Sequence, residues 1–562
     1  MRFTVLLLAA LILASMGVAA TADTGFTAWV ADPLVKVTRN MPATSTRAVQ
    51  IEAVANEYES GQIVVSSGVD IKKMTARISS FDGPAGPKPQ GKLNIVGYVP
   101  IKHGTGGAPE EYIVARPPVE LPDVLFDNKP VSVEKGNNQP VWVTVYVPKG
   151  TVPGKYTASV VINCDNEMAS VPVNVTVHGF ELPDKRTLHV TNWFTAKHIA
   201  DAHKVELWSE PYWKWLEVWA RAMADHRQDT IITPAPQLVK GLDDGNGNLT
   251  FDFSDFDRWV DIFDRSGAGG IIEGAHMCTR MGWDATELHA LYVNTKMPDG
   301  SWRKWVDHAA SGEEHVKVMS QYLPALQKHL EEKGWLQRYV HHIADEPTET
   351  NAKAYVEVAK MIRKYAPKLR IIDACMCESI VGAIDVWVPV TSALDAKMEF
   401  YKGRKQLGEE VWFYTCQAPK GKYMNRFIDY HTLSTRLLHW LNYKYDVTGY
   451  LHWGLTTWRG DPFTNMEPAW RENAYLPPGD DHLVYPGPLG PLSSIRWEAM
   501  RDGIEDYEML KLLEKRNPKL AAEICNSVVQ SFTEYTLDPV VFKKARGRML
   551  DTLETYNGGD NR

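Results

Sequence analysis

Hydrophobic and polar residues alternate along the first third of the chain. Between residues 25 and 182, runs such as QPVWVTVYVPKG, GKYTASVVIN and SVPVNVTVHGF carry an apolar side chain at about every second position, and Gly, Pro and Asn separate them. A period of two is typical of strands, and no stretch in this part keeps a helical period. Short strands separated by turn residues predict an all-β sandwich domain over residues 25–182.

The pattern changes after a short polar linker, GFELPDKR, at residues 179–186. From there, apolar runs of strand length alternate with amphipathic helical stretches. The eight predicted strands cover residues 187–193, 229–234, 270–276, 338–346, 369–376, 383–389, 410–416 and 448–454. Strands that alternate with helices favour a parallel sheet, and eight such repeats predict an α/β domain, a TIM-like (β/α)8 barrel, over residues 187–516.

Two helical stretches are particularly regular. In EEHVKVMSQYLPALQKHLEEKG, apolar residues step by three and four, and Pro324 is expected to kink the helix without ending it. In SSIRWEAMRDGIEDYEMLKLLEK, Ser493 or Ser494 is the expected cap. The residues predicted to face the barrel there are Met500, Ile504, Tyr507 and Leu510. Residues 517–562 predict a C-terminal helical extension packed outside the barrel.

The amino terminus has a different character. It reads MRFTVLLLAALILASMGVAATADTG, with one basic residue, a short apolar run and then small residues. This pattern predicts a secretory signal peptide over residues 1–22, with cleavage after Ala20 or Ala22. We therefore expect an exported protein, either periplasmic or secreted.

Composition narrows the possible partners. The chain of 562 residues is 44% hydrophobic and 23% charged, which is typical of globular proteins. Sixty-nine acidic residues against 61 basic ones give a net charge of −8, which disfavours nucleic acid as a partner. After the amino terminus, no apolar stretch is long enough to span a bilayer.

The segment IADEPTE places Asp345 and Glu346 side by side at the end of the fourth predicted strand. Active sites of such barrels lie at the carboxyl ends of the strands. Pro347 disfavours a helical conformation of the residue before it, so Glu346 is expected to stay extended. Two acids this close do not both ionise easily, which predicts one protonated and one ionised carboxyl, as glycoside hydrolysis requires.

A structural interpretation of the same segment competes with the catalytic one. Asp345 could cap a following helix, with Pro347 in its first turn and Glu349 favoured by the helix dipole. Acidic residues before a helix are common. The position at a strand end of the predicted barrel favours the catalytic interpretation.

Two adjacent histidines raise the question of a metal site. Adjacent His341 and His342 point to opposite sides of a strand, so both cannot bind one ion. One of them is expected to be buried and hydrogen-bonded, where it braces the carboxylates. The six scattered cysteines show no zinc-site spacing, and their pairing stays open. We predict neither a metal nor another cofactor.

Five segments of the chain resemble those of a known enzyme family. In order along the mature chain, ANEYESGQIVV, VPGKYTASV, HHIADEPTE, GYLHWGLTTW and GDDHLVYPGPLGPLSSIRWEAMRDGIEDYEML resemble glycoside hydrolase family 123, the exported β-N-acetylgalactosaminidases. The resemblance implies a β-sandwich followed by a (β/α)8 barrel, and a substrate that is a glycan or glycolipid with a terminal β-linked N-acetylgalactosamine.

The resemblance also implies a mechanism. The 2-acetamido oxygen of the sugar attacks the anomeric carbon and forms an oxazolinium, so that configuration is retained. Glu346 then corresponds to the acid and base, and Asp345 to the residue that accepts the acetamido N–H. The end of the seventh predicted strand, WFYTCQAPKGK, carries no carboxylate, which agrees with a nucleophile supplied by the substrate.

Substrate contacts are predicted at other strand ends. Tyr414 is assigned to the acetamido carbonyl, and Trp453 or Trp458 to the floor beneath the sugar. For each candidate, packing in the barrel interior is the alternative. The predicted binding residues are Asn192, Trp193, His276, Tyr414, Gln417, Trp453 and Trp458. Asp480 and Asp481 could reach sugar hydroxyls or merely shape a turn.

Two other functions stay open at this point. One is a retaining glycosidase with a carboxylate nucleophile of its own, for which Glu378 is a candidate. The other is a barrel that binds glycans through its tryptophans without catalysis. The natural glycan, the choice between galacto and gluco epimers and the oligomeric state do not follow from the sequence.

Overall fold

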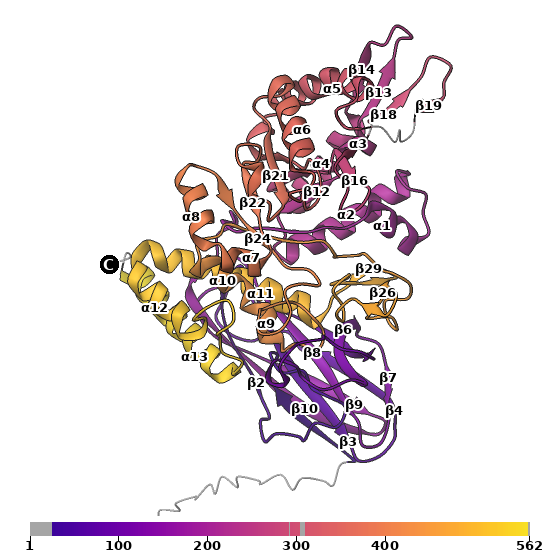
Figure 1. Cartoon of the computed structure of the whole chain (residues 1–562). Helices are drawn as coiled ribbons and strands as arrows, with labels where there is room; N and C mark the ends of the chain where they lie inside the picture. Colours follow the sequence, from indigo (N-terminus) through magenta and orange to yellow (C-terminus); the bar gives the residue numbers. More distant parts are fainter. Residues whose placement is uncertain (1–24, 292, 304–308, 560–562) are drawn as a thin grey trace, which may run out of the picture.

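A computed structural model describes residues 25–291, 293–303 and 309–559 of the chain. The predicted signal peptide, residues 1–22, lies outside the described residues. A β-rich domain forms one end of the molecule, an α/β region forms the other, and the last two helices lie beside the β-rich domain (Figure 1). Among the residues that the structure describes, none of the helices combines the length and apolarity that a bilayer crossing requires.

Two five-stranded sheets make up the N-terminal domain. The first has the order β1 (Phe26–Ala31), β3 (Glu57–Ser67), β8 (Asn138–Val147), β5 (Gln90–Ile101) and β6 (Val119–Asp127). The second has the order β2 (Val49–Ala55), β10 (Glu167–Glu181), β9 (Gly154–Cys164), β4 (Ile71–Ile78) and β7 (Val131–Val133).

Alternation along the strands explains how these two sheets pack. In β10, Val173 and Val175 are buried, whereas Asn174 between them is only partly covered. The valines share one apolar core with Ile63 and Val141 of the first sheet. Every second side chain therefore faces the partner sheet, as the period of two predicts. The predicted β-rich N-terminal domain is confirmed.

Nine short parallel strands form the centre of the α/β region. Six of them form a sheet in the order β12 (Thr230–Thr233), β15 (Ile271–Gly274), β20 (Tyr339–His341), β21 (Arg370–Ala374), β22 (Val386–Val388) and β23 (Glu410–Val411). Three more have the order β11 (His189–Asn192), β25 (Gly449–His452) and β24 (Phe413–Tyr414). Each of the eight predicted strand segments contains at least one of them.

The predicted closed (β/α)8 barrel is not confirmed. Trp412 separates β23 from β24, but its backbone N–H donates to the Trp387 carbonyl at 2.8 Å, so the two sheets adjoin there. No ladder joins β11 to β12 within the described ranges. Side chains bridge this seam instead: Asp229 accepts from the Val190 N–H at 3.0 Å. The Asp229 side chain thus occupies the Val190 N–H, which is then not available for a backbone ladder between β11 and β12.

Helices and short hairpins surround these strands. The helices of this region are α1 (Ala196–His203), α2 (Glu210–Asp225), α3 (Ala235–Leu238), α4 (Ser254–Ser266), α5 (Glu313–Glu332), α6 (Ala352–Tyr365), α7 (Thr391–Ala396), α8 (Met398–Gln406), α9 (Thr432–Arg436), α10 (Leu438–Lys444) and α11 (Ile495–Arg516). The hairpin strands are β13 (Lys240–Asp243), β14 (Leu249–Asp252), β16 (Cys278–Arg280), β17 (Leu288–Ala290), β18 (Asn294–Lys296), β19 (Trp302–Arg303), β26 (Ala469–Arg471), β27 (Ala474–Tyr475), β28 (Tyr485–Gly487) and β29 (Gly490–Leu492).

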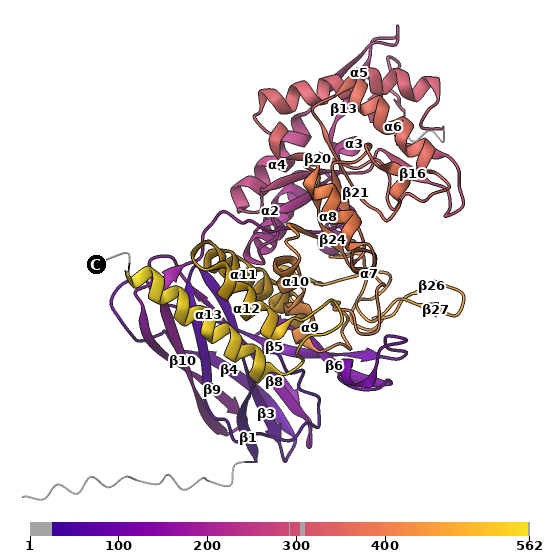
Figure 2. The same cartoon turned by 60° about the vertical axis from the view of Figure 1, so that its left-hand side comes forward.

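Several local predictions hold. α5 continues through Pro324. The Ser494 hydroxyl caps α11 by accepting the Trp497 N–H, which satisfies a donor that a helix start otherwise leaves free. Its predicted inward residues are all buried: Met500, Ile504, Tyr507 and Leu510. The predicted C-terminal extension forms α12 (Pro518–Val528) and α13 (Pro539–Gly559), and α13 lies across the sandwich at β10 (Figure 2).

A buried cluster of charges, which we call the interdomain joint, ties these parts together. It consists of Glu57 and Glu59 of β3, Arg436 of α9, Asp506 of α11 and Arg546 of α13. The Arg436 guanidinium contacts Asp506 at 2.7 Å and Glu59 at 2.6 Å. Arg546 contacts the same two carboxylates, each at 3.0 Å. Arg436 and Arg546 therefore link Glu59 of the sandwich to α9, α11 and α13.

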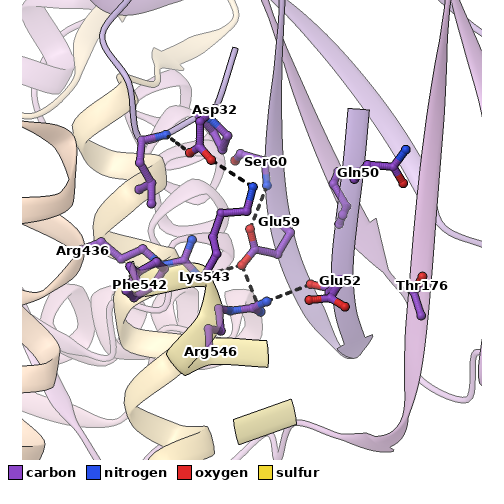
Figure 3. Close-up of a pocket in the computed structure, with 13 residues that line it drawn as sticks. Asp32, Gln50, Glu52, Glu59, Ser60, Thr176, Arg436, Phe542, Lys543 and Arg546 are labelled. Carbon is purple, nitrogen blue, oxygen red and sulfur yellow. Dashed lines mark hydrogen bonds and ion pairs between the residues drawn. The ribbon is translucent and has the colours of Figure 1, made fainter. Parts of the chain in front are cut away.

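A cavity of about 240 Å³ lies beside the interdomain joint (Figure 3). Glu59, Arg436 and Arg546 line its inner side. At its rim, Lys543 pairs with Asp32 at 3.0 Å, and both side chains are more accessible than those of the joint. Glu59, Arg436 and Arg546 are thus paired through ion pairs of the joint, and Lys543 is paired with Asp32.

Candidate active site

An open pocket of about 370 Å³ lies at the carboxyl ends of the parallel strands. The carboxyl end of parallel strands is where ligands bind in α/β proteins of this kind. The polar and aromatic residues of its lining are Trp193, Trp283, Asp345, Glu346, Tyr414, Gln417, Trp453, Arg459, Trp470 and Asp480. Three carboxylates therefore share one aromatic-walled pocket.

The turn that carries the acidic pair departs from the predicted backbone. The strand β20 ends at His341, and Glu346 has φ of 46°, in the left-handed region, rather than the extended conformation we expected. A hydrogen bond from the Glu346 N–H to the Ala374 carbonyl, 3.0 Å long, holds it there. Arg280 also donates to the Glu346 carbonyl. A strained residue fixed by such contacts is typical of functional sites.

The helix-cap interpretation of this segment is wrong. α6 begins at Ala352, and Asn351 precedes it as the cap position. Asp345 lies six positions before Asn351 along the chain and lines the pocket instead. The acidic pair is therefore not used to start a helix.

Contacts differ between the two acids. The Tyr414 hydroxyl donates to Glu346 Oε1, and Arg280 lies 3.5 Å from Glu346 Oε2. Burial, with the neighbouring Glu346 carboxylate as the second cause, raises the pKa of Tyr414 well above its ordinary value, so the phenol stays a donor. Glu346 is thus oriented by one neutral and one charged donor.

Asp345 opens onto the pocket, but protein surrounds it on most sides. Burial raises its pKa to about 7; the adjacent Glu346 carboxylate adds to the rise and Arg280 opposes it. The sequence predicted one acid of the pair with a raised pKa, and Asp345 has one. Burial also raises the pKa of Asp480 to about 7, against the pull of Arg426. The pocket therefore holds acids that titrate near neutral pH.

Four of the predicted binding residues meet in this pocket: Trp193, Tyr414, Gln417 and Trp453. Trp193 follows β11, and its indole N–H donates to Glu273 at 2.8 Å. The indole N–H of Trp453 donates to Asp480 Oδ2 at 3.2 Å. Both rings are thus fixed in orientation by acids of neighbouring segments.

The other three predicted binding residues do not line the pocket. Asn192 is buried, and its amide oxygen accepts from Arg426 at 3.1 Å. The Trp458 indole donates to the Val484 carbonyl at 2.9 Å and packs against the helical core. His276 packs edge-on against Trp193, with ring centroids 5.3 Å apart. Packing and buried hydrogen bonds occupy these three side chains.

Sequence reasoning missed two exposed tryptophans and two arginines. Trp283 and Arg280 lie in the long segment between the third and fourth predicted strands, and the Arg280 guanidinium stacks on the Trp283 ring at 3.8 Å. Trp470 belongs to the hairpin of β26 and β27, which projects from the body of the molecule (Figure 2). Arg459 lines the pocket beside Trp453. Unusually long strand-to-helix segments were the signal that could have found them.

One group of residues has the composition of a metal site. Possible ligand atoms of His276, His342 and Asp373 lie within 4.8 Å of one another. However, both ring nitrogens of His342 already contact carboxylates, Asp373 at 2.7 Å and Glu273 at 2.8 Å. An ion would have to displace one of these hydrogen bonds, so the arrangement suits a protonated imidazole better than a metal.

Comparison with known proteins adds independent findings. Residues 193–513 match the model of the glycoside hydrolase 123 catalytic domain, and residues 35–164 match that of the glycoside hydrolase 123 N-terminal domain. No curated protein matches the chain.

Among solved structures, a family 123 glycoside hydrolase from Clostridium perfringens, studied for glycolipid glycan hydrolysis, has a TM-score of 0.73 at 17% identity. The match covers 95% of this chain and 98% of that one. A termite-gut xylanase with an Ig-like domain is also similar, with a TM-score of 0.32, 13% identity and coverage of 66% and 90%. The likeness to the clostridial enzyme supports the same fold over the matched 95% of the chain.

Proposed function

The chain belongs to glycoside hydrolase family 123, and from that membership we propose that it releases terminal β-linked N-acetylgalactosamine from glycans or glycolipids. We propose an exo-acting, retaining reaction in which the substrate supplies the nucleophile. The clostridial enzyme of similar fold acts on glycolipid glycans, which supports this class of substrate. We further propose that residues 1–22 direct export, which amino-terminal sequencing of the mature protein would test.

The observation that carries the proposal is the adjacent pair Asp345 and Glu346 in one pocket, held differently. A retaining enzyme with its own nucleophile needs a second carboxylate across the scissile bond. Glu378, the candidate from the sequence, does not line the pocket, and it pairs with Lys397 at 2.6 Å. A substrate-assisted reaction needs no such residue.

In the proposed first step, the acetamido oxygen bonds to the anomeric carbon while the glycosidic C–O bond breaks. Glu346 gives its proton to the departing oxygen, and the Asp345 carboxylate accepts the acetamido N–H as the oxazolinium forms. In the second step, Glu346 removes a proton from water, which attacks the anomeric carbon and opens the ring. The two inversions leave the configuration retained.

The raised pKa of Asp345 fits this scheme once the substrate is bound. In the free enzyme, burial favours the protonated form of Asp345 below about pH 7. The acetamido N–H donates a hydrogen bond, and donation to a carboxyl favours its ionised form. Substrate binding therefore promotes ionisation of Asp345 at the moment when a proton is needed on Glu346.

Chromogenic substrates test the proposal. We expect cleavage of 4-nitrophenyl β-N-acetylgalactosaminide, no cleavage of the matching β-galactoside, and inhibition by a thiazoline that mimics the oxazolinium. The gluco epimer, run alongside, measures the epimer preference. Equal rates on the galactoside, which lacks the acetamido group, contradict substrate assistance.

The rival mechanism uses a carboxylate of the enzyme as nucleophile. Asp480 is the third carboxylate of the pocket lining and the structure's candidate for that role. A fluorinated glycoside would then label Asp480 covalently, and mass mapping would locate the label. Binding to immobilised glycans without turnover of any chromogenic substrate would favour the non-catalytic function instead.

A further inference from the structure

A continuous chain of hydrogen bonds connects the pocket wall to the backbone just before the acidic pair. It starts at the Trp193 indole, which donates to Glu273 Oε1 at 2.8 Å. The same carboxylate oxygen contacts His342 Nε2 at 2.8 Å, and His342 Nδ1 contacts Asp373 Oδ1 at 2.7 Å. Four side chains from different strand ends are thereby linked in one row.

The far end of this row holds the turn that leads to the acids. Asp373 Oδ2 accepts the backbone N–H groups of Ile343 at 3.0 Å and Ala344 at 3.4 Å. The Tyr355 hydroxyl donates to the same oxygen at 2.6 Å. Ala344 directly precedes Asp345, so the Asp373 carboxylate holds the near side of this turn, while the Ala374 carbonyl and Arg280 hold Glu346.

The two buried carboxylates on either side of His342 require a positive charge on its ring. The side chains of His342, Glu273 and Asp373 are fully buried, and two buried carboxylates are costly without a cation. Burial alone lowers the pKa of His342, but the hydrogen bonds to Asp373 and Glu273 outweigh it and raise the pKa to about 10. The imidazole is therefore an imidazolium across the neutral range.

Other titratable groups lie close to His342 and Asp373. His276 lies 3.7 Å from Asp373, and burial, with the charge of His342 as the second cause, lowers its pKa well below the ordinary value, so it stays neutral. His342 favours the ionised form of Asp345, whereas Asp373 disfavours it. The titratable and charged groups that face this row in the described part of the chain are His276, Cys278, Arg280, His341, Asp345, Glu346, Tyr355 and Cys375.

We propose that His342, clamped between Glu273 and Asp373, is a positioning residue that fixes the turn of the acidic pair and, through its charge, sets the pH range of catalysis. The activity readouts rest on the proposed function, but the titration of Asp345 does not. His342 touches neither substrate nor reacting atoms; it acts through Asp373 and through its field at Asp345.

The test compares His342→Gln with Asp373→Asn. In His342→Gln, loss of the positive charge raises the pKa of Asp345. The acid limb of the pH profile of kcat/KM, where activity falls as Asp345 takes up a proton, therefore moves to higher pH. In Asp373→Asn, His342 keeps Glu273 as its counter-ion, and loss of the negative charge moves the limb to lower pH. Because the turn loosens in both variants, we expect kcat to fall about 100-fold, with KM nearly unchanged.

His341→Gln is the matched control. His341 is the neighbouring buried histidine, and its contact is the Tyr339 hydroxyl at 2.9 Å, away from both carboxylates. Burial lowers its pKa to about 3, so it carries no charge and its replacement should leave the acid limb in place. A limb that moves equally in His341→Gln and His342→Gln overturns the proposal.

Carbon-13 titration of the Asp345 carboxyl, assigned by its loss in Asp345→Asn, separates this inference from the proposed function. If no acetylgalactosaminide is cleaved but the Asp345 titration still moves in opposite directions in the two variants, the inference stands and the function fails. If the titration does not move, or moves the same way in both variants, the inference is wrong. Should His342→Gln not fold, the direction of the shift in Asp373→Asn decides alone.

Discussion

Glu59 of the interdomain joint and Asp345 of the pocket have pKa values shifted in opposite directions. In the joint, Arg436 and Arg546 outweigh the effect of burial on Glu59 and hold its pKa at about 2, whereas burial outweighs Arg546 at Glu57 and raises the pKa of that carboxyl well above its ordinary value. In the pocket, burial dominates and the pKa of Asp345 rises to about 7. The comparison shows that two cationic partners at hydrogen-bond distance can outweigh the effect of burial on a carboxyl, as they do at Glu59.

The distances from arginine to carboxylate also differ between the joint and the pocket. The two arginines of the joint bridge Glu59 and Asp506 at 2.6 to 3.0 Å, so each of these two carboxylates contacts two cations. In the pocket, Arg280 reaches Glu346 only at 3.5 Å, and Asp345 opens onto the cavity. Acids without full compensation favour a site that exchanges protons with a ligand.

The largest effect is expected from Glu346→Gln. The amide keeps the shape of the side chain but loses the transferable proton, so kcat should fall by about 10³-fold or more. The melting temperature should hardly change, because the glutamate is not part of a buried ion pair. Initial rates on the acetylgalactosaminide and a thermal melt are the measurements. A variant that loses stability but keeps its rate would reverse the assigned roles of the two regions.

Arg546→Met should show the opposite behaviour. It leaves Glu57, Glu59 and Asp506 with fewer cationic partners, which is expected to lower the free energy of unfolding by about 3–5 kcal/mol. Folded molecules should keep the wild-type kcat. Lys543→Met is the control from the same helix, because its accessible pair with Asp32 should contribute at most about 1 kcal/mol. Urea unfolding of both variants measures the difference, and equal losses would contradict a special role of the joint.

Tyr414→Phe tests how the pocket orients its acid. The phenol donates to Glu346, and loss of a hydrogen bond to a charged group costs about 1.5–3 kcal/mol, or roughly 10- to 100-fold in kcat. Tyr423→Phe removes a hydroxyl that donates to Asp395 outside the pocket lining, and it should leave kcat unchanged. If Tyr414→Phe raises only KM, the hydroxyl contacts the substrate equally in ground and transition states rather than aligning the acid.

Local patterns predicted much of the fold and part of the site. Ser494 caps α11 because the cap and the helical period lie within a few residues of each other. The acidic pair reaches the pocket because strand ends of a parallel sheet meet at one edge. Both features depend on neighbours along the chain, which a single sequence displays.

Contacts between distant segments decided the rest. The left-handed φ of Glu346 is fixed by the Ala374 carbonyl and Arg280, from two other segments. Trp458 follows the last strand as predicted, yet the Val484 carbonyl holds its indole away from the pocket. The joint brings residues of β3, α9, α11 and α13 together, and no spacing in the sequence reveals that meeting.

The smallest effect is expected at the pocket rim, where Trp283 is 51% exposed and braced by Arg280. An exposed aromatic ring beside a sugar pocket is suited to stack on the next sugar of a glycan. Trp283→Ala should raise KM for an oligosaccharide by about fivefold, equivalent to about 1 kcal/mol, and leave KM for the nitrophenyl monosaccharide unchanged. Trp302→Ala is the control, because Trp302 is similarly exposed, at 46%, but lies outside the pocket lining. If both variants change KM alike, or Trp283→Ala affects the two substrates equally, the rim does not recognise the glycan, and specificity must arise deeper in the pocket, among the acids.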